Sequence, residues 1–323
     1  MKIRRIGVLT SGGDAPGINA CIRAVVRIAV DHEIEVIGIL EGFDGLIRGE
    51  MKELRARDVG GILGKGGTFL RTARCPAFRE PKSQRKALRE LNETEIEGLI
   101  VIGGDGSMRG AHALAGFNFP VVGVPSSIDN DVWGTDMSIG VDTALNTIMN
   151  AVDKLRDTAT SHERVFLVET MGRECGYLAL NIGVVCGAEV ILVPEMEMTL
   201  QQVAEAIESA YARGKSHAII IVSEGASLKV GAIADYLDAQ EVGFETRVTI
   251  LGHVPRGGSP SAFDRMLATR MGVEAVNALI EGKTDVMVGL DDQGIILVPL
   301  EQVAACSREP NVDFYSMAMI LAR

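Results

Sequence analysis

The segment "PSSIDNDVWGTD", residues 125–136, concentrates side chains that could do chemistry. It follows the apolar run "FPVVGV" and contains Asp129, Asp131 and Asp136. Carboxylates that leave a buried strand are costly unless water, a cation or a reacting group compensates them. A positioned carboxylate can also take the proton from an attacking hydroxyl, and Asp129 or Asp131 could be that base. A turn with solvated carboxylates is the alternative interpretation.

Two glycine-rich turns could bind phosphate: "LTSGGDAPGINA" (9–20) and "VIGGDGSMRGA" (101–111). Glycines such as Gly13 let the backbone approach a ligand, and the N–H groups that open the next helix attract anions. Asp105 lies within the second turn, where a carboxylate suits Mg²⁺ together with phosphate oxygens and water. Ser107 is predicted to cap the helix that follows. Neither turn has the spacing of a Walker A loop, and plain turns are the alternative.

Basic and polar side chains cluster in a third glycine segment and after later strands. A solvated basic face is the ordinary explanation for the third segment, "GKGGTFLRTARCPAFR" (64–79), but in an acidic protein such a cluster beside glycines could clamp a phosphoryl group. The later residues would suit an anionic substrate that carries several hydroxyl groups. The residues concerned are Lys65, Arg71, Arg74, Arg79, Arg173, Glu224, Arg247, His253 and Arg256.

Short apolar runs alternate with helical patterns, which predicts parallel sheets covered by helices on both faces. In such folds ligands lie at the carboxyl ends of the strands, where the polar and glycine clusters fall. The predicted strands are 6–9, 35–40, 98–104, 120–125, 164–170, 189–194, 217–225 and 247–253. The predicted helices include 17–31, 82–91, 141–156 and 200–213.

Composition narrows the class of protein. The chain has 323 residues, 47% of them hydrophobic, which is enough for a large core. A net charge of −11 argues against nucleic acid or an anionic membrane as a partner. The five cysteines show no CxxC spacing, which favours a reducing compartment, and no apolar run is long enough to cross a membrane. We therefore expect a soluble cytoplasmic protein.

Taken together, the segments resemble the 6-phosphofructokinase family along essentially the whole chain. The resemblance is carried by "IGVLTSGGDAPGINA", "GGTFLRTAR", "VIGGDGS", "SIDNDVWGTD", "LRDTATSHERVFLVETMGRECG", "SEG" and "LGHVPRGGSP". It implies two Rossmann-like parallel-sheet domains with the active site in the cleft between them. The larger, ATP-binding domain would comprise 1–140 and 255–305, and the smaller, sugar-phosphate-binding domain 141–254 and 306–323.

The resemblance assigns roles around the nucleotide. Asp105 matches the family's magnesium ligand, and Asp131 matches a residue near the metal. Asp129 matches the base that deprotonates the sugar 1-hydroxyl. Arg173, with Arg74 close by, matches a group that stabilises the transferring phosphoryl. The positions that match ATP contacts are Gly13, Arg74, Cys75, Asp105, Gly106, Ser107 and Gly110.

The resemblance also assigns residues that would bind the sugar phosphate and an effector. Sugar contacts map to Ser127, Met171, Gly172, Glu224 and His253, and the 6-phosphate to Arg164, Arg247, His253 and Arg256. In the family, the residues matching Arg164 and Arg247 come from a neighbouring subunit, which implies a homotetramer. Bacterial members bind ADP or phosphoenolpyruvate at a second site, which maps to Arg23, Arg27, Arg156, Glu189, Arg213, Lys215 and His217.

The implied activity is transfer of the γ-phosphoryl of Mg·ATP to fructose 6-phosphate, the committed step of glycolysis. Gly106 leaves room for the α-phosphate of ATP, whereas pyrophosphate users carry aspartate there. Ser126 replaces the lysine of pyrophosphate users and also the glycine common in ATP users. The alternatives are a pyrophosphate-dependent enzyme and a non-catalytic nucleotide-sensing homologue. An NAD or lipid kinase shares the "GGDG" loop but lacks "IDND" and "MGR".

Overall fold

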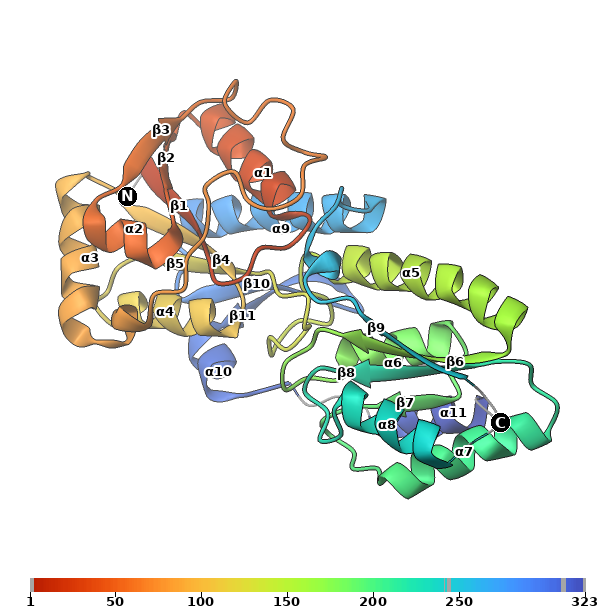
Figure 1. The fold of residues 1–323 in the computed structure, drawn as a ribbon. Coiled ribbons are helices and arrows are strands. Elements are labelled where there is room, and N and C mark those ends of the chain that lie inside the picture. The colour runs from red at the N-terminus through yellow and green to blue at the C-terminus, as the bar shows by residue number, and fades with distance from the viewer. Residues whose placement is uncertain (1–2, 241, 243–244, 309–311, 322–323) are drawn as a thin grey trace. The chain divides into compact units, whose positions relative to one another are not determined.

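The computed structural model describes residues 3–240, 242, 245–308 and 312–321. The chain divides into two compact units, coloured along the chain in Figure 1. Unit 1 comprises Met1–Thr143 and Arg256–Arg308, and unit 2 comprises Ala144–Pro255 and Glu309–Arg323. Part of the predicted closing segment of the smaller domain, 309–311 and 322–323, lies outside the described residues.

Unit 1 is built on a seven-stranded sheet of order β11-β10-β5-β4-β1-β2-β3. Its central strands are parallel, while β3 pairs antiparallel with β2 and β11 with β10. The predicted parallel strands are confirmed, but β3, β10 and β11 were not predicted. All three lie toward the sheet edges. The sequence MKEL of β3 has a weak apolar pattern, whereas VMVGLD of β10 and GIILVP of β11 carry apolar runs that the sequence analysis did not assign. The bounds are β1 Arg5–Ser11, β2 Glu35–Ile39, β3 Met51–Leu54, β4 Gly98–Gly103, β5 Val121–Pro125, β10 Val286–Asp291 and β11 Gly294–Pro299.

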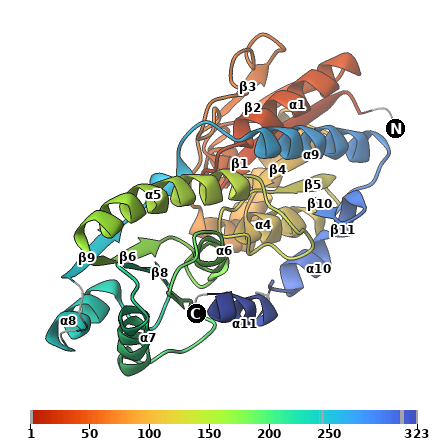
Figure 2. The same cartoon turned by 90° about the vertical axis from the view of Figure 1, so that its right-hand side faces the viewer.

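Helices cover both faces of this sheet, as predicted. Helices α1 (Ile18–Asp31) and α9 (Ala262–Ile280) pack against each other on one face (Figures 1 and 2). The opposite face carries a core cluster that includes Leu99, Met108 and Leu300. The elements that contribute to that cluster are α2 (Gly42–Arg48), η1 (Pro76–Arg79), α3 (Pro81–Glu93), α4 (Asp105–Ala115) and α10 (Leu300–Ala305).

Unit 2 has a four-stranded parallel sheet of order β7-β8-β6-β9. Its strands are β6 Arg164–Thr170, β7 Val190–Leu192, β8 Ala218–Ser223 and β9 Glu245–Ile250. Helices α7 (Leu200–Ala212) and α8 (Val230–Gln240) share a core cluster with the sheet, and α6 (Tyr177–Val185) contacts α11 (Val312–Leu321). Short η2 (Val254–Arg256) follows β9. Within the described ranges, no helix combines the length and apolarity needed to cross a membrane.

Helix α5 (Val141–His162) starts in unit 1 and continues in unit 2. It extends past the predicted end at Arg156. The hydroxyls of Thr160 and Ser161 donate to the carbonyls of Arg156 and Asp157 at 2.9 Å each. These back-bonds let two poor helix formers occupy the last turn, which residue preferences alone did not predict.

Candidate active site

Three strand ends of unit 1 meet at one level of the sheet. Ser11 of β1 pairs with Gly103 of β4, and Gly103 pairs with Pro125 of β5. Both glycine-rich turns and the acidic segment follow directly after these residues. The parallel register therefore brings the three sequence motifs to the same edge of the sheet.

The turns after β1 and β4 are joined by a buried hydroxyl. Ser107 Oγ donates to the carbonyl of Ser11 at 3.0 Å. The prediction that Ser107 caps the helix is wrong, because α4 begins at Asp105 with Gly104 as its N-cap. Gly104 has an extended backbone, so the helix starts earlier and the serine lies inside its first turn, where it links the two turns.

Asp105 is the half-buried carboxylate at the start of α4. It forms an ion pair with Arg109, four residues along the helix. Burial raises its pKa, the Arg109 charge opposes that rise, and the Asp131 carboxylate adds to it. The two acids are therefore close enough to interact electrostatically. Among the residues that the structure describes, no group of three or more His, Cys, Asp or Glu could hold a metal. A pair of carboxylates fits Mg²⁺, which completes its shell with phosphate oxygens and water.

The acidic segment forms a turn that is held by hydrogen bonds of its own residues. Asp129 is 3% exposed, which excludes a solvated turn for this carboxylate. Ser127 Oγ donates to Asp131 Oδ1 at 2.6 Å. Asn130 has a positive φ of 52°, and its side-chain amide binds the Ser138 N–H and the Asp136 carbonyl at 2.9 and 3.0 Å. Sequence reasoning did not single out Asn130, although a buried amide in such a segment suggests a turn former.

The glycines matched to ATP contacts differ in their surroundings. A Cβ atom added to Gly106 would meet nothing within 4 Å, so the space beside it is open. One added to Gly110 would meet Phe43 at 2.7 Å, and Phe43 stacks on Phe78. Gly110 therefore also serves core packing. Cys75 lies against the same cluster, while Arg74 is exposed.

The third glycine segment is tied to the first by residues that the sequence analysis did not identify. Buried Asn19 donates to the carbonyl of Lys65 at 3.0 Å and accepts from the N–H of Phe69 at 2.6 Å. Thr72 Oγ1 donates to the carbonyl of Gly12 at 2.9 Å. Amides and hydroxyls in such places carry no local signal, because their partners lie dozens of residues away in the sequence.

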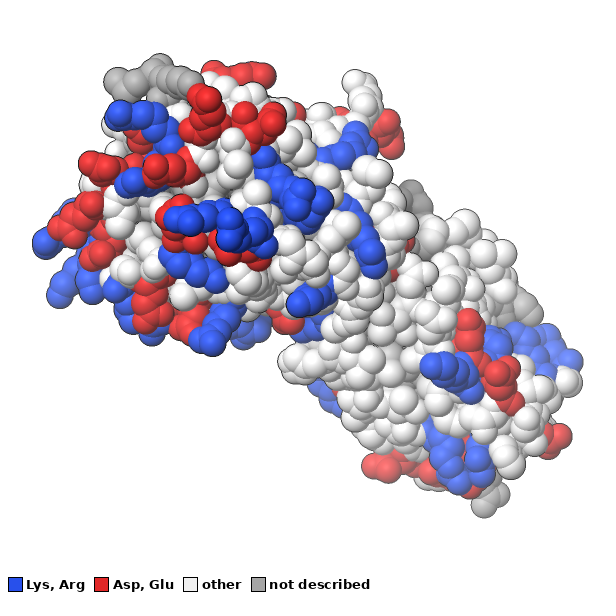
Figure 3. Space-filling view, turned by 90° about the horizontal axis from the view of Figure 1, so that it is seen from above, with Lys and Arg blue, Asp and Glu red and all other residues white. Residues whose placement is uncertain are grey.

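Arg256, matched to the sugar 6-phosphate, lies in unit 1 beside the first glycine turn. Its Nη1 donates to the carbonyl of Asp14 at 3.1 Å, and a Cβ atom on Gly13 would meet its guanidinium. The basic residues of the third glycine segment, Lys65, Arg71, Arg74 and Arg79, are exposed. On the face of unit 1 seen in Figure 3, basic side chains lie next to acidic ones. The net charge of −11 therefore does not make this face uniformly acidic.

In unit 2, the ends of β6 and β8 meet in the same way. Thr170 pairs with Ser223, and Glu224 Oε1 accepts the N–H groups of Gly172 and Arg173 at 3.3 and 2.9 Å. Arg173 has a positive φ of 50°, a conformation that a non-glycine residue adopts only under constraint. Glu224 thus holds the turn that presents Arg173, while Met171 beside it is buried.

Glu245 holds both arginines that the family resemblance matches to the 6-phosphate across subunits. Arg164 Nε donates to Glu245 Oε2 at 2.6 Å, and Arg247 pairs with Glu245 Oε1. The hydrogen bond from Arg164 lowers the pKa of the Glu245 carboxyl, and Arg247 lowers it further. Sequence reasoning missed Glu245, although its place at the start of β9, two residues before Arg247, is a detectable signal. His253 follows β9 and is exposed.

Most residues matched to the effector form one cluster in unit 2. Glu189 is 7% exposed and accepts from Lys215 Nζ at 3.0 Å and from the N–H of Ile219 at 2.6 Å. Burial, and then the charge of Arg156, lowers the pKa of His217. Arg156 also donates to the carbonyl of Cys186. Arg213, the C-cap of α7, donates to the Ser209 hydroxyl, whereas Arg23 and Arg27 lie on α1 of unit 1.

Comparisons with known proteins agree on one family. A model of the phosphofructokinase family matches residues 5–279. The ATP-dependent 6-phosphofructokinase of Brevibacillus brevis is 50% identical over 322 residues, covering 99% of this chain and 100% of the relative. That of Thermotoga neapolitana is 50% identical over 321 residues, with the same coverage.

Solved structures give the same fold. The phosphofructokinase of Pichia pastoris in the T-state matches with a TM-score of 0.89 and 36% identity; all of this chain is covered, and it spans 37% of that longer chain. A pyrophosphate-dependent phosphofructokinase from Marinobacter aquaeolei matches with a TM-score of 0.88 over 96% of this chain and 86% of that one, at 22% identity. The latter likeness bears on the fold alone.

The fold and the strand-end motifs define an α/β kinase. The chain belongs to the phosphofructokinase family, which confirms the resemblance seen in the sequence.

Proposed function

We propose that this chain transfers the γ-phosphoryl of ATP to the 1-hydroxyl of fructose 6-phosphate, giving fructose 1,6-bisphosphate and ADP, the committed step of glycolysis. One observation carries the proposal. The register of β1, β4 and β5 brings two glycine turns and a buried acid to one sheet edge, in a chain half identical to ATP-dependent relatives over its full length.

In this proposal Asp129 is the base for the sugar 1-hydroxyl. Its burial keeps competing water away, and the Asn130-centred turn holds its backbone. Phosphoryl transfer depends mainly on positioning and on stabilising charge, so a buried, fixed carboxylate suits the task. Ser127 would contact the sugar, and its bond to Asp131 orients that second acid.

Asp105 would bind Mg²⁺ directly, with Asp131 near the metal. Bound Mg²⁺ would neutralise charge on the phosphates of ATP. The interaction between the two carboxylates supports this assignment, since a divalent cation relieves their mutual repulsion. Arg109 would have to release Asp105 when the metal binds.

ATP would bind along the glycine turns of unit 1. The N–H groups around Gly13 and at the start of α4 would face its phosphates, with Ser107 beside them, and the open space beside Gly106 would take the α-phosphate. Arg74, Cys75 and Gly110 would complete this site. The donor is expected to be ATP because an aspartate at Gly106, as in pyrophosphate users, would fill that space with negative charge.

The sugar phosphate would be bound by polar groups after the strands of unit 2 and by Arg256. Glu224 would accept from sugar hydroxyls, beside Met171, Gly172 and His253. Arg164, Arg247, His253 and Arg256 would bind the 6-phosphate, and Arg173 would stabilise the transferring phosphoryl group with Arg74. Guanidinium groups suit both tasks, because they donate several hydrogen bonds and stay charged.

A homotetramer follows from the proposed sharing of Arg164 and Arg247 between subunits. The cluster around Glu189, Lys215 and Arg156, with Arg213, His217, Arg23 and Arg27, would bind ADP or phosphoenolpyruvate as an effector. Its cationic groups around a nearly buried carboxylate support an anionic ligand, with or without a metal ion.

The test is the initial rate of fructose 6-phosphate phosphorylation with magnesium, comparing ATP and pyrophosphate. We expect turnover with ATP only. Turnover with pyrophosphate would overturn the donor argument from Gly106 and Ser126. Turnover with neither donor would favour a non-catalytic nucleotide sensor.

A further inference from the structure

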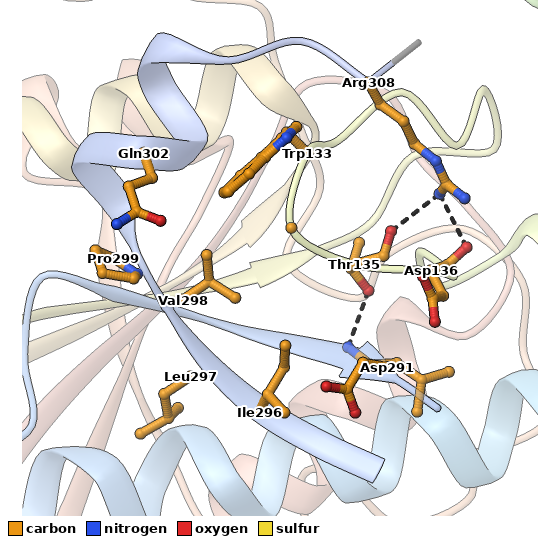
Figure 4. Close-up of a pocket in the computed structure, with 12 residues that line it drawn as sticks. Trp133, Thr135, Asp136, Asp291, Ile296, Leu297, Val298, Pro299, Gln302 and Arg308 are labelled. Carbon is orange, nitrogen blue, oxygen red and sulfur yellow. Dashed lines mark hydrogen bonds between the residues drawn. The ribbon is translucent and has the colours of Figure 1, made fainter. Parts of the chain in front are cut away.

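Arg308, the last residue of unit 1, bonds the acidic segment through one nitrogen. Its Nη1 donates to the carbonyls of Thr135 and Asp136 at 2.9 Å each (Figure 4). It also donates to the carbonyl of Asn130 at 3.4 Å. The three acceptors lie in the turn that carries the two acids assigned to catalysis. Arg308 itself has no place in the proposed binding of ATP or sugar.

Contacts from several parts of unit 1 hold this turn. Residues 126–140 form no helix or strand, so their carbonyls need partners outside regular structure. On one side β10 binds the turn, because the N–H of Asp136 donates to the carbonyl of Leu290 at 2.8 Å and the N–H of Leu290 donates to Thr135 Oγ1 at 3.0 Å. Neither of these bonds satisfies a carbonyl of the turn. Arg308 supplies a charged donor to two of the same residues, and such bonds are the stronger kind.

A cavity lies beside this turn. It has a volume of about 530 Å³, and its lining includes Trp133, Val298, Gln302 and Arg308 (Figure 4). Ile128 and Val132 of the turn are buried, but the cavity leaves the side near Arg308 less densely packed than a core. On the side of the cavity the turn is therefore held by hydrogen bonds, and Arg308 makes three of them.

We propose that Arg308 is a positioning residue that fixes the turn bearing Asp129 and Asp131. The inference rests on the proposed function, since it assumes that these acids act in phosphoryl transfer. A base works only when it lies within hydrogen-bond reach of the proton it takes. A displacement of the turn by about 1 Å would lower the rate by about 10- to 100-fold without touching substrate.

The test compares two substitutions at this position. Arg308→Met removes the donors, and we expect kcat to fall about 10- to 100-fold while the KM for ATP changes less than about twofold. Arg308→Lys places an ammonium with three N–H donors where one guanidinium nitrogen serves three carbonyls. We expect lysine to restore most of the rate.

Arg5→Met is the matched control. Arg5 also donates to a backbone carbonyl, that of Thr94 at 2.7 Å, but it opens β1 at the opposite end of the strand from the glycine turn. We expect it to lower thermal stability and leave kcat unchanged. Amide hydrogen exchange supplies a readout independent of turnover, and exchange within 130–138 should quicken in Arg308→Met alone.

The outcomes separate the two proposals. Wild-type protein without fructose 6-phosphate kinase activity would overturn the proposed function. An active wild type whose Arg308→Met variant keeps its kcat and its exchange rates would overturn the positioning role alone. A low kcat in both Arg308→Met and Arg308→Lys would also contradict the positioning role, because that role needs only the three donated hydrogen bonds.

Discussion

The acids of unit 1 and the arginines of unit 2 are held in opposite ways. Asp129 is 3% exposed and belongs to a turn whose backbone and amide groups bond one another. The side chains of Arg247 and Glu245 are 43% and 51% exposed, and a single carboxylate holds Arg247 and Arg164. The first arrangement is buried and joins side chains to the main chain, whereas the second is exposed and joins side chains to one another.

The difference follows from what each group would have to do. A base must already be in place when the hydroxyl arrives, so its turn is fixed before substrate binds. A phosphate-binding arginine can instead rest on a carboxylate that the incoming phosphate replaces, since exposed ion pairs contribute little. Glu245 would occupy the arginines until the sugar phosphate arrives.

The strongest test of this contrast is Asp129→Ser. Removing the base should lower kcat by about 10²- to 10⁴-fold, with the fold intact, measured by initial rates and circular dichroism. Asp136→Ser is the control, because Asp136 lies in the same segment and is exposed. Equal turnover in Asp129→Ser and wild type would remove the assignment of the base.

Gly106→Asp tests whether the open space in unit 1 belongs to the nucleotide. A Cβ atom at this position meets no protein atom within 4 Å, so the protein should fold normally while kcat/KM for ATP falls at least about tenfold through charge repulsion. Gly231→Asp is the matched control for Gly106→Asp, since Gly231 is also the second residue of a helix and also faces open space. Normal ATP kinetics in Gly106→Asp would contradict the donor argument.

Glu245→Gln tests whether the carboxylate of Glu245 competes with the sugar phosphate for the two arginines of unit 2. Freeing both arginines should lower the KM for fructose 6-phosphate by about two- to fivefold and leave kcat unchanged, as steady-state kinetics would measure. Glu53→Gln is the control, because Glu53 pairs with Arg55 at 54% exposure, far from any proposed ligand. A raised KM would mean that Glu245 helps to position the arginines.

The smallest expected effect is the contribution of His217 to the pH dependence of stability. Burial and Arg156 lower its pKa in the folded state, so the unfolded state binds the proton more readily. The free energy of unfolding of the wild type, relative to that of His217→Gln, should therefore be greatest above pH 6.5, the ordinary pKa of histidine. It should decrease as the pH falls from there toward the pKa of the folded state. Urea unfolding at pH 8, 7, 6 and 5.5 would measure it, and parallel curves would contradict it.

Local signals predicted much of this protein. Continuous apolar runs identified the central parallel strands, and the glycine, acid and arginine motifs that follow them were visible because each is a short segment. Strands β3, β10 and β11 were not predicted. The start of α4 at Asp105 was not predicted either, because its N-cap is a glycine with an extended backbone.

Partners distant in the sequence could not be predicted. Asp264, fully buried, accepts the N–H groups of Gly140 and Thr143 at 2.8 Å each and so anchors the start of α5, although it lies more than 120 residues further along. Asn19 holds the third glycine segment in the same way. A polar residue within a helix carries no sign of which backbone it will meet.

The sequence by itself determined the central strands, several of the helices, the motifs after the strands and the family, because apolar periodicity and glycine turns act over a few residues. Only the tertiary structure decided that Ser11, Gly103 and Pro125 align, that Glu245 holds two arginines, and that Arg308 bonds a turn more than 170 residues away. Those contacts depend on strand register and on chain crossings, which arise when the whole chain packs.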